Sequence, residues 1–224
     1  MKDIKLTENF TMYQFEPAGQ RVLGQNIFVL HHNRECIVFD AGYEVHMAEL
    51  KPILETYDIK HVILTHFHPD HCYGLNELPK QNVIGSKNYI DTLTIFNDLD
   101  NDLLKPSVTV DSKSSIEFYN HKIDMYRNPG HSICGLIIVI DDTFVLVGDD
   151  ILSTNENNPV LPFIAYTIDS HQTSLSFIKK NYSDKVLLPS HGSPLFENQT
   201  KELDKRLQYI KFLKTKEKNI DVLH

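Results

Sequence analysis

The stretch of this sequence that decides its fold and its chemistry reads Leu64-Thr65-His66-Phe67-His68-Pro69-Asp70-His71. It places three imidazoles and one carboxylate within six residues, which is far denser than in an ordinary surface loop. The preceding run, residues 61–65, is short, apolar and rich in β-branched side chains, and it predicts a buried strand that ends at the cluster. Since Pro69 stops this strand from continuing as regular structure, we expect the cluster to lie in a loop.

The spacing within the cluster predicts two binding points. Residues two apart in an extended segment point the same way, so His66 and His68 converge on one metal ion. Asp70 and His71 follow after the chain has turned, and they face a second point nearby. Neutral imidazole and carboxylate are the ligands that borderline divalent metals such as zinc prefer. The alternative, a solvated turn rich in histidine, explains this spacing poorly.

Composition and charge limit the class of protein. Of the 224 residues, 41% are apolar and 23% are charged, which is typical of a globular protein with a substantial core. The net charge of −8, without any stripe dense in lysine and arginine, argues against a nucleic-acid partner. The first residues lack the apolar core of a signal peptide and no apolar run reaches membrane-spanning length, so we expect a cytoplasmic protein without a membrane partner. The three widely spaced cysteines indicate neither a disulfide framework nor a zinc finger.

Apolar runs predict strands along most of the chain, and segments with helical spacing predict helices between them. The predicted strands are residues 10–15, 26–30, 35–39, 61–65, 82–85, 108–110, 115–118, 122–126, 136–140, 143–147 and 185–188. The predicted helices are residues 44–57, a segment through residues 89–96, a segment capped by Asp169 or Ser170, and residues 196–216. Because no low-complexity tract or break in composition interrupts residues 1–224, we expect a single domain.

Three later strands also end in a ligand-type residue. These residues are His131, Asp149 and His191. Loops at one edge of rigid sheets are where sites are built, because the scaffold fixes what the loops display. Together with the first cluster, the three residues supply five imidazoles and two carboxylates, enough for two metal ions that share a bridging solvent. Each one taken alone is also consistent with an ordinary turn residue, but their agreement favours a metal site.

The sequence resembles the metallo-β-lactamase superfamily, whose signature is His-x-His-x-Asp-His followed by three later single ligands. The matching segments here are His66-Phe67-His68-Pro69-Asp70-His71, Pro129-Gly130-His131-Ser132, Gly148-Asp149 and Ser190-His191-Gly192. The order and the spacing match, and the resemblance spans essentially the whole chain. It implies an α/β (α+β) fold, an αββα sandwich of two mixed β-sheets flanked by helices, which agrees with the two groups of predicted strands.

The resemblance also implies two metal ions, whose ligands are His66, His68 and His131 for the first and Asp70, His71 and His191 for the second. Asp149 is the implied bridge between them, in preference to Asp150, because the family's carboxylate directly follows the glycine. Two Zn²⁺ ions per chain are the expected cofactor, with iron or manganese as alternatives. Asp40, at the end of the strand 35–39, is either a partner that orients a metal-bound histidine or a turn-forming residue.

The activity implied by the resemblance is hydrolysis. A hydroxide bridged between two divalent metals attacks an ester, thioester or lactone-type bond of a small molecule. Asp70 is the candidate catalytic residue, because it is placed to orient the nucleophile and pass its proton to the leaving group. The main alternative is an iron-dependent oxidoreductase similar to persulfide dioxygenases, followed by a phosphodiesterase or a non-catalytic binding module. True β-lactamases of this superfamily lack a bridging aspartate at the position of Asp149.

Three loops are predicted to form the substrate walls. They are residues 73–80, 96–106 and 153–167. Cys72 and Tyr73 depart from the small residues usual in the family and place a thiol and a phenol beside the site; we expect Cys72 to be a packed residue rather than a nucleophile. Tyr73 and Tyr166 are the candidate substrate-binding residues, and Tyr166 either donates to a developing oxyanion or packs. The sequence identifies neither the physiological substrate nor the oligomeric state.

Overall fold

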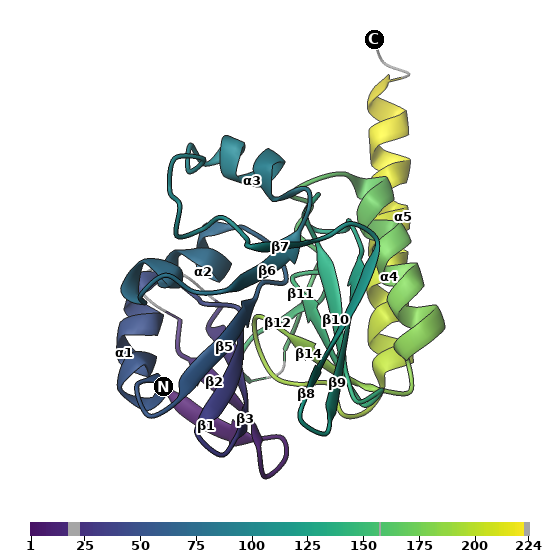
Figure 1. Ribbon diagram of the computed structural model, residues 1–224. Coiled ribbons are helices and arrows are strands. Elements are labelled where there is room, and N and C mark those ends of the chain that lie inside the picture. Colours follow the sequence, from purple (N-terminus) through teal and green to yellow (C-terminus); the bar gives the residue numbers. More distant parts are fainter. Residues whose placement is uncertain (18–22, 157, 222–224) are drawn as a thin grey trace.

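In the part of the chain that the structure describes, two β-sheets pack face to face with helices on both outer faces (Figure 1). The structure is a computed structural model that describes residues 1–17, 23–156 and 158–221, with side chains through residue 216. The helices α1 (Glu44–Leu54) and α3 (Tyr89–Ile95) lie on one face, and α4 (Ile168–Tyr182) and α5 (Gln199–Asp221) lie on the other. This arrangement is the predicted αββα sandwich.

The first sheet takes its strands in sequence order. They are β1 (Lys2–Lys5), β2 (Phe10–Phe15), β3 (Gln25–His32), β4 (Glu35–Phe39), β5 (Asp58–Ile63), β6 (Val83–Ser86) and β7 (Val108–Val110). Neighbours from β1 to β4 are antiparallel, whereas neighbours from β4 to β7 are parallel. Parallel strands need a crossover connection, which α1 supplies between β4 and β5 and α3 supplies between β6 and β7.

The second sheet brings three strand ends to one edge. Its order is β14-β11-β10-β9-β8, and its strands are β8 (Lys113–Phe118), β9 (His121–Arg127), β10 (Leu136–Ile140), β11 (Phe144–Gly148) and β14 (Val186–Pro189). Strand β10 is antiparallel to both β9 and β11, and β14 is parallel to β11. Since β9, β11 and β14 therefore run the same way, their carboxyl ends lie together. A separate ribbon pairs β12 (Leu152–Ser153) with β13 (Pro159–Val160).

The predicted ligands follow these strand ends closely. His131 comes after β9, Asp149 after β11 and His191 after β14, while residues 66–71 follow β5 of the first sheet. The two sheets meet here, because the Leu136 N–H donates to the Thr65 carbonyl oxygen at 2.8 Å. The sandwich topology therefore explains why residues so far apart in sequence share one edge.

Alternation along β10 shows how the core is layered. Ile138 and Ile140 point between the sheets, where they pack with residues of the first sheet such as Phe28. Ile137 and Val139 point the other way, against the helices α4 and α5. All of these β10 side chains are 5% exposed or less, as expected for a strand covered on both faces.

Most predicted elements are confirmed, with differences mainly at their ends. Strand β5 begins at Asp58 rather than at residue 61 and ends at Ile63, because its amino-terminal part pairs with β4 from Glu35 onward. Pro69 does not prevent regular structure: it is the first residue of the short helix α2 (Pro69–Cys72), a position where its missing N–H costs nothing. The α4 cap is Thr167, whose hydroxyl accepts from the Ser170 N–H, instead of Asp169 or Ser170.

The sequence analysis missed the short strands β1, β12 and β13, which are exposed or only two residues long. Of the helices in the described residues, none has the length and apolar character that crossing a bilayer requires.

The layer between the sheets is expected to provide much of the folding free energy. Truncating Ile138 to alanine removes fully buried apolar volume and should lower the free energy of unfolding by about 2–5 kcal/mol. Urea denaturation measures this difference. Val45→Ala, at a side chain 60% exposed on α1, is the matched control and should change stability by less than about 0.5 kcal/mol. Equal effects of the two substitutions would contradict this layering.

Candidate metal centre

The side chains predicted as metal ligands meet at the shared edge of the sheets. Among the described residues they form two groups, and within each group the possible ligand atoms all lie within 4.8 Å of one another. The first group is His66, His68 and His131, and the second is Asp70, His71, Asp149 and His191. The structure thus brings together every residue of the predicted set, and it separates His66 and His68 from Asp70 and His71 as their spacing suggested.

The first group comes from the loop after β5 and the loop after β9. The Nδ1 atom of His68 lies 3.2 Å from the Nε2 atom of His131. The ring of His66 is centred 4.5 Å from that of His68 and 5.4 Å from that of His131. His68 is still extended, with φ −69° and ψ 153°, and it precedes the first turn of α2. This change of direction after His68 sends the next two ligand-type side chains toward the second group.

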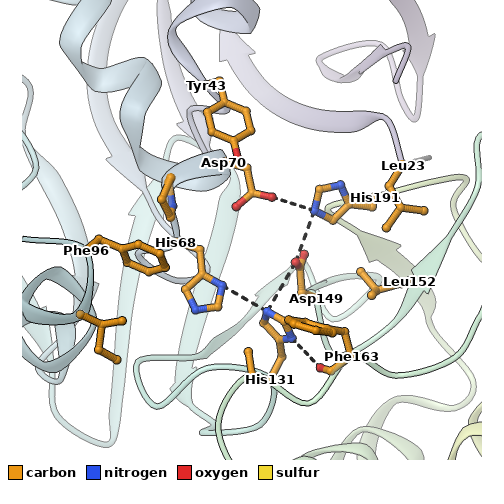
Figure 2. Close-up of a pocket in the computed structure, with 13 residues that line it drawn as sticks. Leu23, Tyr43, His68, Asp70, Phe96, His131, Asp149, Leu152, Phe163 and His191 are labelled. Atoms are coloured by element: carbon orange, nitrogen blue, oxygen red, sulfur yellow. Dashed lines mark hydrogen bonds and ion pairs between the residues drawn. The ribbon is translucent and has the colours of Figure 1, made fainter. Parts of the chain in front are cut away.

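Asp149 lies between the groups. Its Oδ2 atom is 3.3 Å from Nε2 of His191 and 3.7 Å from Nε2 of His131, and its Oδ1 atom is 3.4 Å from Nε2 of His71. Asp70 faces the same space, with Oδ2 3.4 Å from Nε2 of His191 (Figure 2). A carboxylate that faces imidazoles of both groups is placed to bridge two cations.

Hydrogen bonds behind the imidazoles set which nitrogen faces the site. Nδ1 of His131 donates to the Phe163 carbonyl oxygen at 3.0 Å, and Nδ1 of His191 donates to the Gly24 carbonyl oxygen at 2.6 Å. A carbonyl oxygen only accepts, so Nδ1 of each ring carries a proton and Nε2 is the nitrogen that faces the site. Partners of this kind orient histidines for metal binding.

Buried atoms without partners supply a second test of the fit. In the described part of the chain, Nε2 of His66, Nε2 of His71 and Oδ1 of Asp149 are buried and have no hydrogen-bond partner. Leaving such atoms unsatisfied is costly, and clusters of them point to an ion as the missing partner. Imidazole nitrogens and carboxylate oxygens are the donors that divalent transition metals select. The residues present therefore fit a metal centre.

Asp40 anchors the second group from behind. Its side chain is completely buried and accepts from the Thr65 N–H at 2.7 Å, the Thr65 hydroxyl at 2.8 Å and the Ser190 hydroxyl at 2.9 Å. It also accepts from Nδ1 of His71 at 2.9 Å, which leaves Nε2 of that ring facing the site. Of the two roles considered for Asp40, the structure shows the one that orients a histidine. Its left-handed backbone, φ 57°, also places it in the turn after β4.

Asp150 is a second anchor, which the sequence analysis considered only as a rival bridge. Its Oδ1 atom accepts from the His131 N–H at 2.8 Å, and its Oδ2 atom accepts from the Ser174 hydroxyl at 2.6 Å. The carboxylate approaches the chain so closely that a Cβ atom on Gly130 would lie 2.1 Å from it. Glycine is therefore required before His131, and α4 holds this loop through Ser174.

The two groups differ in their electrostatics. Burial lowers the pKa of His66 well below its usual value and, with the neighbouring His131, lowers the pKa of His68 to about 4. Burial opposes charge at His191 as well, but the carboxylate of Asp149 outweighs it and raises the pKa of His191 to about 10. Burial of Asp70 is likewise outweighed by His71 and His191, which hold its pKa at about 2. The second group thus keeps its carboxylates ionised beside positive charge.

A cavity of 630 Å³ opens above both groups (Figure 2). Its described lining is Leu23, Tyr43, His68, Pro69, Asp70, Ile95, Phe96, His131, Asp149, Leu152, Phe163, Ala165 and His191. Two of the three predicted walls contribute to it, Phe96 from residues 96–106 and Phe163 from residues 153–167. Tyr43 and Leu23 were missed, because nothing in their local sequence indicates that the fold brings them to the site.

Neither of the two predicted substrate-binding tyrosines is among the described residues that line the cavity. The Tyr73 hydroxyl donates to Oδ2 of Asp98 at 2.6 Å, and its ring packs on the core beside α1, so residues 73–80 are absent from the described lining. Tyr166 is 44% exposed next to the lining residue Ala165, and it does not line the cavity itself. Substrate contact by either tyrosine remains a prediction. Cys72 is fully buried, as expected of a packed residue.

Comparison with known proteins agrees with this geometry. The family model described as the metallo-beta-lactamase superfamily matches residues 21–191. The chain belongs to the metallo-β-lactamase superfamily. Among solved structures, a metallo-β-lactamase from Pontibacter korlensis superposes with a TM-score of 0.74 at 16% identity, covering 94% of this chain and 98% of that one.

Other superfamily members superpose similarly. A DIM-1 metallo-β-lactamase exposed to ceftazidime gives a TM-score of 0.75 at 15% identity, covering 93% of this chain and 96% of that one. A β-lactamase domain protein from Burkholderia ambifaria gives a TM-score of 0.71 at 17% identity, covering 92% of this chain and 74% of that one. No curated protein matches the sequence significantly. At these identities the likeness establishes the superfamily fold and says nothing about substrate.

The anchoring role of Asp40 predicts the effect of its replacement in this superfamily member. In Asp40→Asn the amide cannot accept all the hydrogen bonds of Thr65, Ser190 and His71, so zinc affinity should fall about 10–100-fold. Competition with a chromophoric chelator measures the affinity, and far-UV circular dichroism checks folding. Asp100→Asn, at an exposed carboxylate, is the control and should bind zinc normally. Normal zinc affinity in a folded Asp40→Asn protein would refute the role.

In the metal-free protein, the charges of the second group should make the free energy of unfolding depend on pH. Because the folded pKa of His191 is raised to about 10, its pairing with Asp149 stabilises the fold fully below the unfolded value of about 6.5. That stabilisation is lost as the pH rises toward 10. After chelation, the free energy of unfolding should therefore decline between pH 6.5 and 10, and less steeply in His191→Gln. Denaturant titrations across this range test it, and identical slopes in the two proteins would contradict the assignment.

Proposed function

We propose that the protein is a binuclear metal-dependent hydrolase that cleaves an ester, thioester or lactone bond of a small molecule. The observation that supports this most strongly is the position of Asp149, whose carboxylate faces His131 of the first group and His71 and His191 of the second. A single-metal protein has no need for a second complete ligand group. The cavity above both groups is of a size suited to a small molecule, about 300–1,000 Å³.

The donor set favours two Zn²⁺ ions, held by His66, His68 and His131 and by Asp70, His71 and His191, with Asp149 between them. Iron and manganese accept the same nitrogen and oxygen donors, so metal analysis must decide. Bound divalent metals would supply an activated water and polarise the carbonyl of the substrate. Side chains of the protein would transfer the proton and position the reacting groups.

Asp70 is the residue that we assign to proton transfer. It lines the cavity, its side chain is 26% exposed, and His191 and His71 lie 3.4 and 3.7 Å from its oxygens. With its pKa held at about 2, the group stays a carboxylate at neutral pH and can accept a hydrogen bond from the attacking water, which orients that water. A carboxylate of so low a pKa does not store the proton but passes it directly to the leaving oxygen or sulfur, so that acid and alcohol or thiol are the products.

The other residues hold the reacting groups in place. Asp40 and Asp150 fix the histidines through the hydrogen bonds described above, so the site needs little rearrangement when substrate arrives. Tyr43 borders the cavity on the side of Asp70, opposite Phe163 and Leu152 (Figure 2). The substrate is expected to enter between these sides with its carbonyl toward Asp149.

A hydrolysis panel tests the proposed function. The zinc-, manganese- and iron-reconstituted proteins would be assayed with an ester, a thioester, a lactone, a phosphodiester and a β-lactam. We expect turnover of the ester, thioester or lactone and a loss of about 100-fold or more in kcat for Asp70→Asn, because the amide cannot accept the proton. Asp91→Asn, at an exposed residue of α3, should keep full activity.

Other outcomes select the alternatives. If the fully metallated protein hydrolyses no substrate of the panel and the iron form consumes oxygen with a persulfide substrate, the protein is an oxidoreductase and not a hydrolase. Turnover of only the phosphodiester or only the β-lactam would keep the hydrolase but replace the proposed bond type with that one. Full activity of Asp70→Asn would remove Asp70 from the mechanism.

A further inference from the structure

Large apolar side chains are exposed at the mouth of the cavity. Ile95 is 72% exposed, Phe96 38% and Phe163 65%, and all three line the cavity. They come from separate parts of the chain: Ile95 and Phe96 end α3, whereas Phe163 lies between β13 and α4. Exposed apolar residues scattered singly need no explanation, but a group of them around a functional cavity marks a binding surface.

Phe96 and Phe163, the aromatic pair, flank the first ligand group. The ring of Phe96 is centred 5.6 Å from that of His68, and the ring of Phe163 is centred 5.9 Å from that of His131 (Figure 2). The backbone of Phe163 is fixed as well, because its carbonyl oxygen accepts from Nδ1 of His131. The pair therefore stands in the cavity lining directly beside the first ligand group.

The lining of the cavity is apolar apart from the ligand residues. Of the thirteen described residues around the cavity, eight are apolar or aromatic, and the other five belong to the ligand groups. None of the thirteen is lysine or arginine. Apart from the metal centre, the described walls thus offer apolar surface and no cation to pair with a carboxylate or phosphate on the far end of a substrate.

We propose that the aromatic pair forms a binding subsite for an apolar acyl or aryl group, so that the preferred substrate is an uncharged ester, thioester or lactone that carries such a group. The inference rests on the proposed hydrolase function and names its substrate class. The scissile carbonyl faces Asp149, and the apolar group lies between Phe96 and Phe163. Burying each methylene there contributes about 0.8 kcal/mol, or about fourfold in affinity.

Esters matched in length and charge test this through turnover. We expect kcat/KM of the zinc protein to rise about tenfold or more from methyl butyrate to methyl octanoate. Monomethyl suberate, of the same length as methyl octanoate but with a terminal carboxylate, should be hydrolysed about tenfold less efficiently than methyl octanoate. A preference for the suberate ester, or equal rates for all three, would overturn the proposal.

Substitutions locate the effect on the aromatic pair. Phe96→Ala and Phe163→Ala should each lower kcat/KM for methyl octanoate about tenfold and change that for methyl acetate less than about twofold. Phe212→Ala, at a phenylalanine 52% exposed on α5, is the matched control and should change neither. Because the Phe163 carbonyl oxygen remains in the variant, zinc content should be unchanged. Loss of zinc from Phe163→Ala would mean that the ring holds His131 rather than substrate, and the proposal would fail.

Binding without turnover separates the subsite from the hydrolase function. Calorimetry on the zinc protein should show octanamide binding about tenfold or more tighter than butanamide, with the difference lost in both variants. If this holds while no ester is hydrolysed, the subsite stands and the proposed function fails. If esters are hydrolysed but chain length and the variants have no effect, the subsite fails and the function stands. A dimer that dissociates in Phe163→Ala would assign the pair to contact between copies and overturn the proposal.

Discussion

The buried carboxylate of Asp40 is the constraint on which the site depends. It accepts hydrogen bonds from Thr65, Ser190 and His71, which belong to the loops after β5 and β14 and to α2. Each donor is a ligand or immediately precedes one, so a single side chain sets the position of three imidazoles. Burying an ionised carboxylate is expensive unless its hydrogen-bonding capacity is filled, and this one is filled by the groups that it positions.

Fold and site reinforce each other at this edge of the sandwich. The Leu136 N–H donates to the Thr65 carbonyl oxygen, and the Asn26 N–H donates to that of Ser190, so the sheets are joined at the residues that Asp40 holds. Asp150 repeats this arrangement on the other side, where it ties the His131 loop to α4. The two aspartates together explain how loops from both sheets keep the ligand atoms of each group close to one another.

The sequence predicts the ligands better than their surroundings, for a physical reason. His66 to His71 lie within one short segment of sequence, and local spacing alone indicates their chemistry. His131, Asp149 and His191 follow from strand ends and from the family motif. The support from Asp150 and from the Phe163 carbonyl oxygen depends on how α4 and the loop before it pack, which no local pattern encodes. Tyr73 is a candidate only because it lies beside the ligands in sequence; in the fold its hydroxyl donates to Asp98, and substrate contact by this residue stays a prediction.

The central claim is that these residues hold two metal ions bridged by Asp149. Anomalous diffraction from crystals of the zinc-reconstituted protein, recorded on both sides of the zinc absorption edge, tests it most directly. The account predicts two peaks, one among His66, His68 and His131 and one among Asp70, His71 and His191, with the Asp149 carboxylate between them. A single peak, or a second peak away from Asp149, would contradict the binuclear site.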